Sequence, residues 1–143
     1  MRVVSIAGLT LMVAAMAGLW GTHALLSRSP FVIGAQVAAV GLVLWARITF
    51  GRRSFHAAAN PTEGGLVTTG PYHYIRHPIY TAACLFGWAG VLAHMSVVSV
   101  ALGGLLILGS VMRMLTEERL VAQRYPAYRE YAQTTKRMVP YVF

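Results

Sequence analysis

Four long apolar stretches constrain this chain more than any other feature of its sequence. They run from Val3 to Leu26, from Phe31 to Phe50, from Ile79 to Ala93 and from Val97 to about Leu115. A helix needs about 20 mainly apolar residues to cross the hydrocarbon of a bilayer, and only the third stretch is clearly short of this. We therefore predict an all-α integral membrane protein with about four transmembrane helices.

The composition supports a membrane location. Of the 143 residues, 57% are hydrophobic and 11% are charged, whereas about 25% of the residues of soluble domains are charged. The length predicts a single domain, residues 1–143. The first stretch could be a signal peptide with Arg2 as its basic start, but its apolar run exceeds the roughly 7–15 residues of such a core. Cys84 is the only cysteine, which excludes an intrachain disulfide, and we predict no metal site.

A tight turn is expected between the last two apolar stretches, because only three residues separate them: His94, Met95 and Ser96. This spacing predicts a helical hairpin in the C-terminal half of the chain. Both helices of the hairpin carry small residues that allow close contact in lipid, among them Gly87, Gly90, Gly103 and Gly109. Packing alone would explain these glycines.

The net charge of +8 is distributed unevenly along the chain. If the N-terminus is cytoplasmic and the chain crosses four times, only Arg28 lies outside. The basic residues then expected inside are Arg2, Arg47, Arg52, Arg53, Arg76, Arg113, Arg119, Arg124, Arg129, Lys136 and Arg137. Because cytoplasmic loops carry an excess of Lys and Arg, we expect both termini and the segments 51–78 and 116–143 in the cytoplasm, at a bacterial cytoplasmic membrane. Pro126 should divide the second segment into two helices.

The stretch Gly70–Tyr80, "GPYHYIRHPIY", concentrates polar and aromatic residues beside the third apolar stretch. Pro78 suits the first turn of a helix, so His77 should lie where that helix begins. Free backbone N–H groups at a helix start favour a carboxylate or phosphate, and Arg76 and His77 add donors. The tyrosines of this stretch, Tyr72, Tyr74 and Tyr80, offer faces for an adenine or a cation. An anchor at the headgroup level is the alternative explanation for the tyrosines.

A second group of candidates lies at the end of the fourth apolar stretch. Arg113 and Glu117 are four residues apart and share a helix face, and Glu118 follows directly. A glutamate near the hydrocarbon boundary is costly without a partner. Structural pairing with Arg113 and a role in receiving an ammonium group or orienting a substrate are both compatible with this spacing.

Together these residues resemble a known family. "LVTTGPYHYIRHPIY", a hairpin and then "EERL" followed by spaced tyrosines resemble the isoprenylcysteine carboxyl methyltransferase family, which is related to the membrane phospholipid methyltransferases. The similarity covers residues 66–143. Its most specific part is the pattern Gly-x-Tyr-x-x-x-Arg-His-Pro-x-Tyr.

This resemblance implies an integral membrane methyltransferase that uses S-adenosylmethionine, bound between the hairpin and the C-terminal segment. Carried over by position, the cofactor-binding residues are Tyr74, Arg76, His77, Tyr80, Glu117 and Glu118. Arg113 corresponds to a basic residue near the active centre. The catalytic candidates are therefore Arg113 and Glu118.

The expected acceptor is a lipophilic small molecule or a lipid that partitions into the membrane, methylated at a carboxyl, hydroxyl or amine group. Arg113 could position an anionic acceptor, and Glu118 or His77 could serve as a base for a neutral or ammonium acceptor. The alternative function is that of a non-enzymatic transporter or assembly subunit, for which Gln36 gives slight support. We expect no nucleic-acid partner, because the basic residues follow the membrane topology. The oligomeric state does not follow from the sequence.

Overall fold

The computed structural model describes residues 1–51 and 65–143. In these residues the chain forms five α-helices and a short 3₁₀ helix, namely α1 (Arg2–Gly21), α2 (Pro30–Phe50), η2 (Gly70–His73), α3 (Pro78–Ala93), α4 (Val97–Arg124) and α5 (Tyr128–Thr134). No strand is present in this part of the chain, apart from one isolated bridge between Ile75 and Lys136. The all-α class is therefore confirmed for the described residues.

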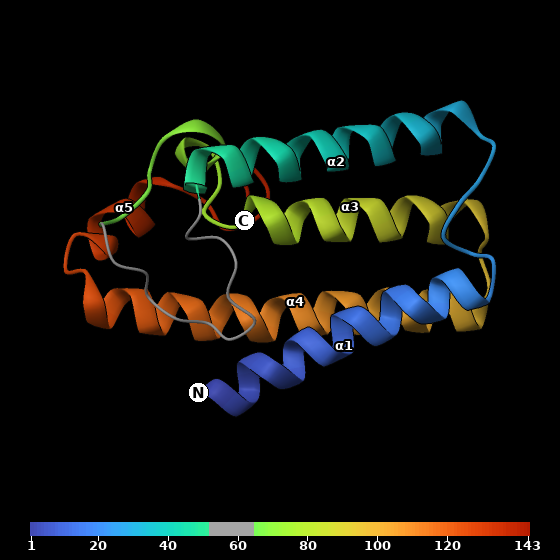
Figure 1. Cartoon of the computed structure of the whole chain (residues 1–143), viewed down its shortest axis with the longest axis horizontal. Helices are drawn as coiled ribbons and strands as arrows, with labels where there is room; N and C mark the ends of the chain where they lie inside the picture. The colour runs from blue at the N-terminus through green and yellow to red at the C-terminus, as the bar shows by residue number, and fades with distance from the viewer. Residues whose placement is uncertain (52–64) are drawn as a thin grey trace.

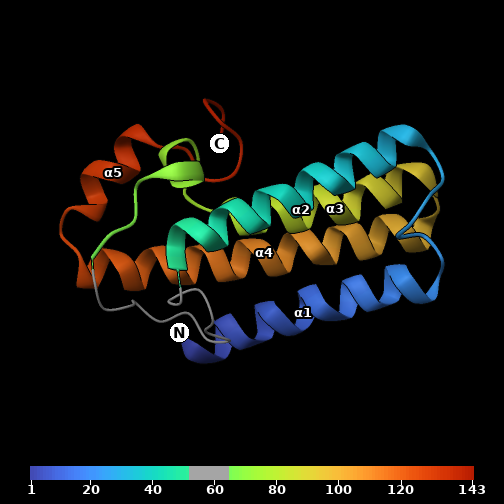
Figure 2. The same cartoon turned by 45° about the horizontal axis from the view of Figure 1, so that its top comes forward.

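The four long helices lie along the long axis of the molecule, with α2, α3 and α4 side by side and α1 crossing α4 at an angle (Figures 1 and 2). By length and composition, α1, α2 and α4 can each cross a membrane. The third predicted span is shorter: α3 has 16 residues, or roughly 24 Å at 1.5 Å per residue. The structure thus supports three spans, and the fourth crossing stays a prediction.

The first helix ends before the apolar stretch does. We predicted helix to Leu26, but α1 ends at Gly21, and His23 follows with a φ of 56°. This left-handed conformation turns the chain away from the helix axis. Ala24 and Leu25 were predicted to continue the helix. They instead lie in the connection between α1 and α2, where they are buried.

The fourth helix continues beyond the predicted end of the span. It runs without a break through Thr116 to Arg124, because no glycine or proline lies between Gly109 and Pro126. Pro126 then separates α4 from α5, as predicted. Segment 116–143 therefore does not begin with a separate helix, and Glu117 and Glu118 stand on the same rigid helix as Arg113.

The predicted hairpin between α3 and α4 is confirmed, and the turn has a defined cause. Ser96 caps α4: its hydroxyl accepts from the Ser99 backbone N–H at 3.0 Å, and the Ser99 hydroxyl accepts from the Ser96 N–H at 2.9 Å. This reciprocal pair satisfies free donors at the start of the helix.

The small residues of the hairpin allow close contacts with segments outside the hairpin as well as within it. A Cβ at Gly103 would meet Trp88 of α3, which is a contact within the hairpin. A Cβ at Gly109, however, would lie 2.6 Å from the carbonyl oxygen of Gly8 in α1, and a Cβ at Gly90 would lie 2.3 Å from that of Leu25. The principal helix pairs are accordingly α1 with α4 and α2 with α3.

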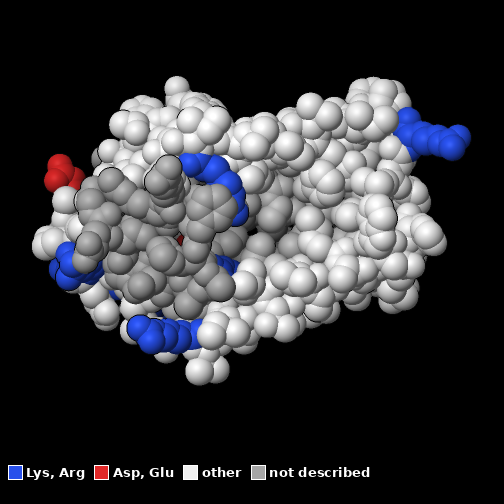
Figure 3. Space-filling view, viewed as in Figure 1, with Lys and Arg blue, Asp and Glu red and all other residues white. Residues whose placement is uncertain are grey.

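The two ends of the bundle differ in charge. The connections between α1 and α2 and between α3 and α4 lie at one end, while α5 and the end of α2 lie at the other, and both termini lie in this second half (Figure 1). Arg28 belongs to the first connection. On the face in Figure 3, one basic side chain marks that end and the others lie in the opposite half. Residues 52–64 of the predicted segment 51–78 lie outside the described residues. Arg52 and Arg53 are among them.

Candidate functional site

The sequence around Arg76 and His77 forms a short extended bridge that leads into α3. The Arg76 N–H donates to the Lys136 carbonyl at 2.8 Å, and the His77 N–H donates to the Arg137 carbonyl at 2.9 Å. His77 is the N-cap residue of α3, and Pro78 occupies the first turn, where its missing N–H causes no loss. The motif therefore joins the start of α3 to the C-terminal segment.

Glu118 lies at the centre of a cluster of basic side chains. Its carboxylate accepts from Arg76 Nη2 at 2.7 Å and from Arg76 Nε at 3.0 Å. His77 Nε2 lies 3.2 Å from the same oxygen, and Arg137 Nε donates to the other oxygen at 3.2 Å. The Glu118 side chain is only 13% exposed. A carboxylate that is largely buried needs such partners, so this cluster keeps Glu118 ionised.

Arg76 connects three parts of the chain. Besides its two bonds to Glu118, its Nη1 donates to the carbonyl oxygens of Ala132 at 2.6 Å and Thr135 at 2.9 Å. The planar guanidinium suits several acceptors in fixed directions. Because these bonds reach Glu118 of α4 and two carbonyl oxygens at the end of α5, Arg76 attaches the end of α5 to α4.

Glu117 belongs to a different group of residues. The Tyr80 hydroxyl donates to Glu117 Oε1, and Arg113 Nη2 lies 3.3 Å from the same oxygen. Arg113 Nε in turn donates to the Tyr80 hydroxyl at 2.8 Å. The Arg113 residue is 6% exposed, and the Glu117 side chain is 27% exposed.

His77 lies between the two carboxylates. Its Nε2 faces Glu118 at 3.2 Å and its Nδ1 lies 3.9 Å from Glu117 Oε2. Its ring is 5.8 Å from that of Tyr80. The structure thus brings six of the predicted site residues into one cluster: Arg76, His77, Tyr80, Arg113, Glu117 and Glu118.

Tyr74, the seventh predicted residue, lies apart from this cluster. It is half exposed and packs near Trp45 and His73. It also lines a hollow of about 650 Å³ between the segment before α3 and the C-terminal segment. The other residues lining this hollow are Leu66, Thr68, His73, Ala127, Glu130, Tyr131, Thr134, Thr135, Lys136 and Tyr141. None of the six clustered residues lines it.

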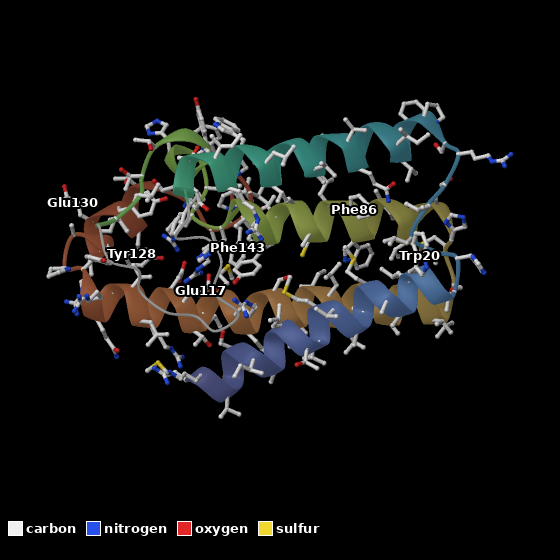
Figure 4. The ribbon with its side chains drawn as sticks, viewed as in Figure 1. Trp20, Phe86, Glu117, Tyr128, Glu130 and Phe143 are labelled. Atoms are coloured by element: carbon white, nitrogen blue, oxygen red, sulfur yellow. The ribbon has the colours of Figure 1, made fainter. Side chains whose placement is uncertain are left out.

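Several residues of the site were missed by the sequence reasoning. Arg137 was counted only for topology, yet it contacts Glu118. Tyr128 of α5 is buried near the same carboxylate, with its ring 6.0 Å from the Arg76 guanidinium carbon. Figure 4 shows Tyr128 and Glu117 turned toward the interior, while Glu130 lies at the outer edge. The spacing of the tyrosines after Glu118 was the sequence signal that could have indicated Tyr128. For Arg137 the signal was the pair of basic residues, Lys136 and Arg137, that follows α5.

Burial keeps the phenols of α5 neutral. It raises the pKa of Tyr131 to about 12. It also raises the pKa of Tyr128, and the nearby charge of Glu118 adds to this effect. Both hydroxyls therefore stay protonated well above neutral pH, and Tyr131 donates a hydrogen bond to the carbonyl oxygen of Tyr72. In residues 1–51 and 65–143, no three side chains of His, Cys, Asp or Glu lie close enough to hold a metal ion.

Comparison with known proteins places this site in a family. The phospholipid methyltransferase family matches residues 30–128, which include α2, the Arg76–His77 motif, the hairpin and both glutamates. The cobalt-zinc-cadmium resistance protein CzcN of Cupriavidus metallidurans is 32% identical over 126 residues, which cover 86% of this chain and 52% of that protein. The nickel-cobalt-cadmium resistance protein NccN of Alcaligenes xylosoxydans xylosoxydans is 33% identical over 126 residues, covering 85% and 52%.

This chain therefore spans about half the length of the curated relatives it matches. No solved structure matches it. The family match extends over more than two thirds of the chain and confirms the resemblance stated above. The chain belongs to the phospholipid methyltransferase family, one of the isoprenylcysteine carboxyl methyltransferase-like membrane methyltransferases.

Proposed function

We propose that this protein is an integral membrane methyltransferase that uses S-adenosylmethionine and methylates a lipophilic acceptor. The observation that carries the proposal is the convergence of three segments at one end of an apolar bundle. The Arg76–His77 motif, the two glutamates of α4 and the C-terminal segment meet there. All but the last segment lie within the residues that the family match covers.

The side chains at this end suit the groups of the cofactor. Glu117 is more exposed than Glu118, so it is the better placed to receive the ammonium group. Arg137 is 36% exposed and donates to Glu118 through Nε, so the rest of its guanidinium can approach the cofactor's carboxylate. The adjacent rings of His77 and Tyr80 offer faces for the sulfonium.

Bound there, the cofactor supplies a methyl group whose bond to sulfur breaks as the acceptor oxygen or nitrogen bonds to the carbon. The protein's task is to align the two and to exclude water. Arg113 is buried beside Tyr80 and Glu117, and we assign it the positioning of an anionic acceptor group. A buried arginine can hold such a group in two directions at once.

The base for a neutral or ammonium acceptor is better assigned to His77 than to Glu118. Two arginines, Arg76 and Arg137, contact Glu118, and nearby positive charge disfavours protonation of a carboxylate. In the neutral tautomer that carries its proton on Nε2, His77 donates a hydrogen bond to Glu118. Its Nδ1, on the Glu117 side, is then free of a proton and can accept one from the acceptor. Glu118 then acts on the reaction by orienting His77.

The acceptor is expected to be a lipid or another molecule that partitions into the bilayer. Many apolar side chains of α1 and α2 are exposed on the surface of the bundle, which suits contact with lipid chains. The family description makes a phospholipid amine the first acceptor to test.

Binding and transfer can be measured directly. The protein would be reconstituted in nanodiscs and titrated calorimetrically with S-adenosylmethionine and S-adenosylhomocysteine. Methyl-labelled cofactor would then be incubated with vesicles of phosphatidylethanolamine, with phosphatidylcholine vesicles as the control. We expect saturable cofactor binding, competition by the product, and label in the phosphatidylethanolamine lipid. A folded sample that binds neither compound would overturn the proposal.

A second candidate is a non-enzymatic membrane subunit that acts in metal resistance. Its support is slight: the two relatives are named as metal-resistance proteins. It predicts no cofactor binding and no labelled lipid in the experiment above, so the same measurements separate the two candidates.

We further propose that both termini face the cytoplasm of a bacterial cell. The support is the charge difference between the two ends of the bundle. In a variant lacking Cys84, a cysteine added after Phe143 should be labelled by an impermeant thiol reagent only after the cells are opened. Labelling in intact cells would contradict this orientation.

A further inference from the structure

Helix α1 lies outside residues 30–128, the part of the chain that the family match covers. It nevertheless packs along α4 (Figure 2), in the most extensive contact between two helices of the described chain. One part of this contact lies directly beside Arg113, the residue to which we assign the acceptor. This raises the question of what α1 contributes there.

Helix α1 passes beside the stem of Arg113 at Gly8. A Cβ at this position would lie 2.8 Å from the carbonyl oxygen of Gly109, 3.0 Å from Arg113 Cγ and 3.2 Å from Met112 Cβ. The first of these atoms belongs to the α4 backbone and cannot rotate away. The missing side chain of Gly8 therefore provides the space in which the stem of Arg113 lies between the two helices.

The guanidinium of Arg113 is held on three sides. Its Nη1 donates to the carbonyl oxygen of Ser5, one turn before Gly8 on α1, at 3.4 Å. Its Nε donates to Tyr80 of α3 at 2.8 Å, and Nη2 lies 3.3 Å from Glu117. Because the guanidinium is planar and rigid, these contacts together fix the direction in which it presents its N–H groups.

We propose that α1 is a positioning element for Arg113, with Gly8 providing the space for its stem and the Ser5 carbonyl fixing its guanidinium. The inference rests on the proposed function, in which Arg113 holds the acceptor. Displacing α1 should then change the alignment of the acceptor and leave cofactor binding intact, because the atoms nearest to a Cβ at Gly8 belong to Gly109, Met112 and Arg113 and not to the cofactor-facing residues.

The test compares Gly8→Ala with Gly18→Ala. Gly18 lies on the same helix and faces the same partner, but a Cβ there would meet only the end of the Leu102 side chain. For transfer to phosphatidylethanolamine vesicles, we expect Gly8→Ala to lower kcat by roughly tenfold to a hundredfold. We expect its dissociation constant for S-adenosylhomocysteine to stay at the wild-type value. Gly18→Ala should keep both values.

A second readout does not depend on catalysis. The Nε–H signal of Arg113 can be followed by NMR in protein labelled with ¹⁵N-arginine and assigned through its loss in Arg113→Lys. Buried and bonded to Tyr80, this N–H should exchange slowly with water. We expect Gly8→Ala to shift the signal and accelerate its exchange, and Gly18→Ala to leave it unchanged.

The outcomes separate the two proposals. If wild-type protein shows no transfer but the NMR signal responds only to Gly8→Ala, the proposed function fails and the role of α1 stands. If transfer is found and both variants keep the wild-type kcat and signal, the role of α1 is overturned. Should Gly8→Ala not fold, Gly109→Ala replaces it, since the atoms nearest to its Cβ would be those of Gly8 and Met12 of α1. Wild-type kcat in that variant would equally overturn the inference.

Discussion

Glu117 and Glu118 are neighbours on α4, but their surroundings belong to different halves of the site. Glu118 is enclosed by Arg76, His77 and Arg137, which come from the motif before α3 and from the C-terminal segment. Glu117 faces Tyr80 and Arg113, on the helices of the bundle. Successive residues of a helix point in different directions, so one turn of α4 supplies both regions.

The comparison shows how adjacent, chemically identical side chains can acquire different tasks. Glu118 has many fixed partners and little exposure, which suits a residue that holds segments together. Glu117 is twice as exposed, which suits a residue that meets a ligand. Substitution of Glu118 should therefore lower the free energy of unfolding more than substitution of Glu117 does.

The largest effect is expected from Glu118→Gln. Removing the carboxylate leaves Arg76 and His77 without their shared partner in a largely buried place, and breaking a buried ion pair costs about 3 kcal/mol or more. The free energy of unfolding in detergent should fall by about this amount, and cofactor affinity should fall with it. Glu130→Gln, an exposed change on α5, is the matched control. Equal stability of the two variants would contradict the structural role of Glu118.

A somewhat smaller loss is expected from Arg76→Lys. The lysine keeps the charge but cannot reproduce the two bonds to Glu118 together with those to Ala132 and Thr135. We expect a loss of about 2 kcal/mol and faster cleavage of the C-terminal segment by added protease. Arg129→Lys, on the exposed part of α5, should leave the cleavage rate unchanged. If both variants are cleaved at the wild-type rate, Arg76 does not attach this segment.

Glu117→Gln tests the other half of the comparison. We expect the affinity for S-adenosylmethionine to fall roughly tenfold, because a charge-assisted bond to the ammonium group is lost. Stability should change less than in Glu118→Gln, since Tyr80 can still donate to the amide oxygen. Calorimetry and unfolding of the same two samples give the comparison. The reverse ranking, with Glu117→Gln the less stable protein, would show that the two roles are exchanged.

The smallest effect concerns the packing of α5 and depends on pH. The raised pKa of Tyr131, about 12 against an ordinary 10.0, means that the folded state favours the neutral phenol. The contribution of the protonated Tyr131 hydroxyl to the free energy of unfolding is complete below pH 10, and it is lost as the pH rises through about 12. Tyr131→Phe should cost about 1 kcal/mol at neutral pH, through the bond to the Tyr72 carbonyl. The difference between wild type and variant should shrink above pH 10, and a difference independent of pH would contradict this account.

The sequence predicted the parts of the fold that depend on local pattern. Hydropathy located the long helices, three residues between two stretches predicted the hairpin, and Pro126 predicted the break before α5. It could not predict which helices pair, because helices that are apolar on all sides carry no directional pattern. The contact of Gly8 with Gly109, across most of the chain, is an example that spacing does not reveal.

The site was predicted in part, for a similar reason. The i,i+4 spacing of Arg113 and Glu117 predicted their contact, and the family resemblance brought the motif and the glutamates together. Neither source gave separate partners to the two glutamates, because the direction of each side chain depends on tertiary packing. Arg137 was missed since its contact with Glu118 depends on a backbone bridge of a single residue pair, Ile75 with Lys136, which has no sequence signature.

The position of Arg76 has a consequence for the order in which this protein matures during its synthesis. Its partner Glu118 follows 42 residues later, and the carbonyl of Thr135 follows 59 residues later. A ribosome that has just completed α4 has therefore produced the ion pair but not the groups that enclose it. Until Ala132 and Thr135 emerge, Arg76 Nη1 lacks both of its carbonyl acceptors. A chain truncated before Thr135 would keep its apolar helices, but the end of α5 would not be fully attached to α4. We expect proteases that degrade incompletely folded membrane proteins to cleave at this end.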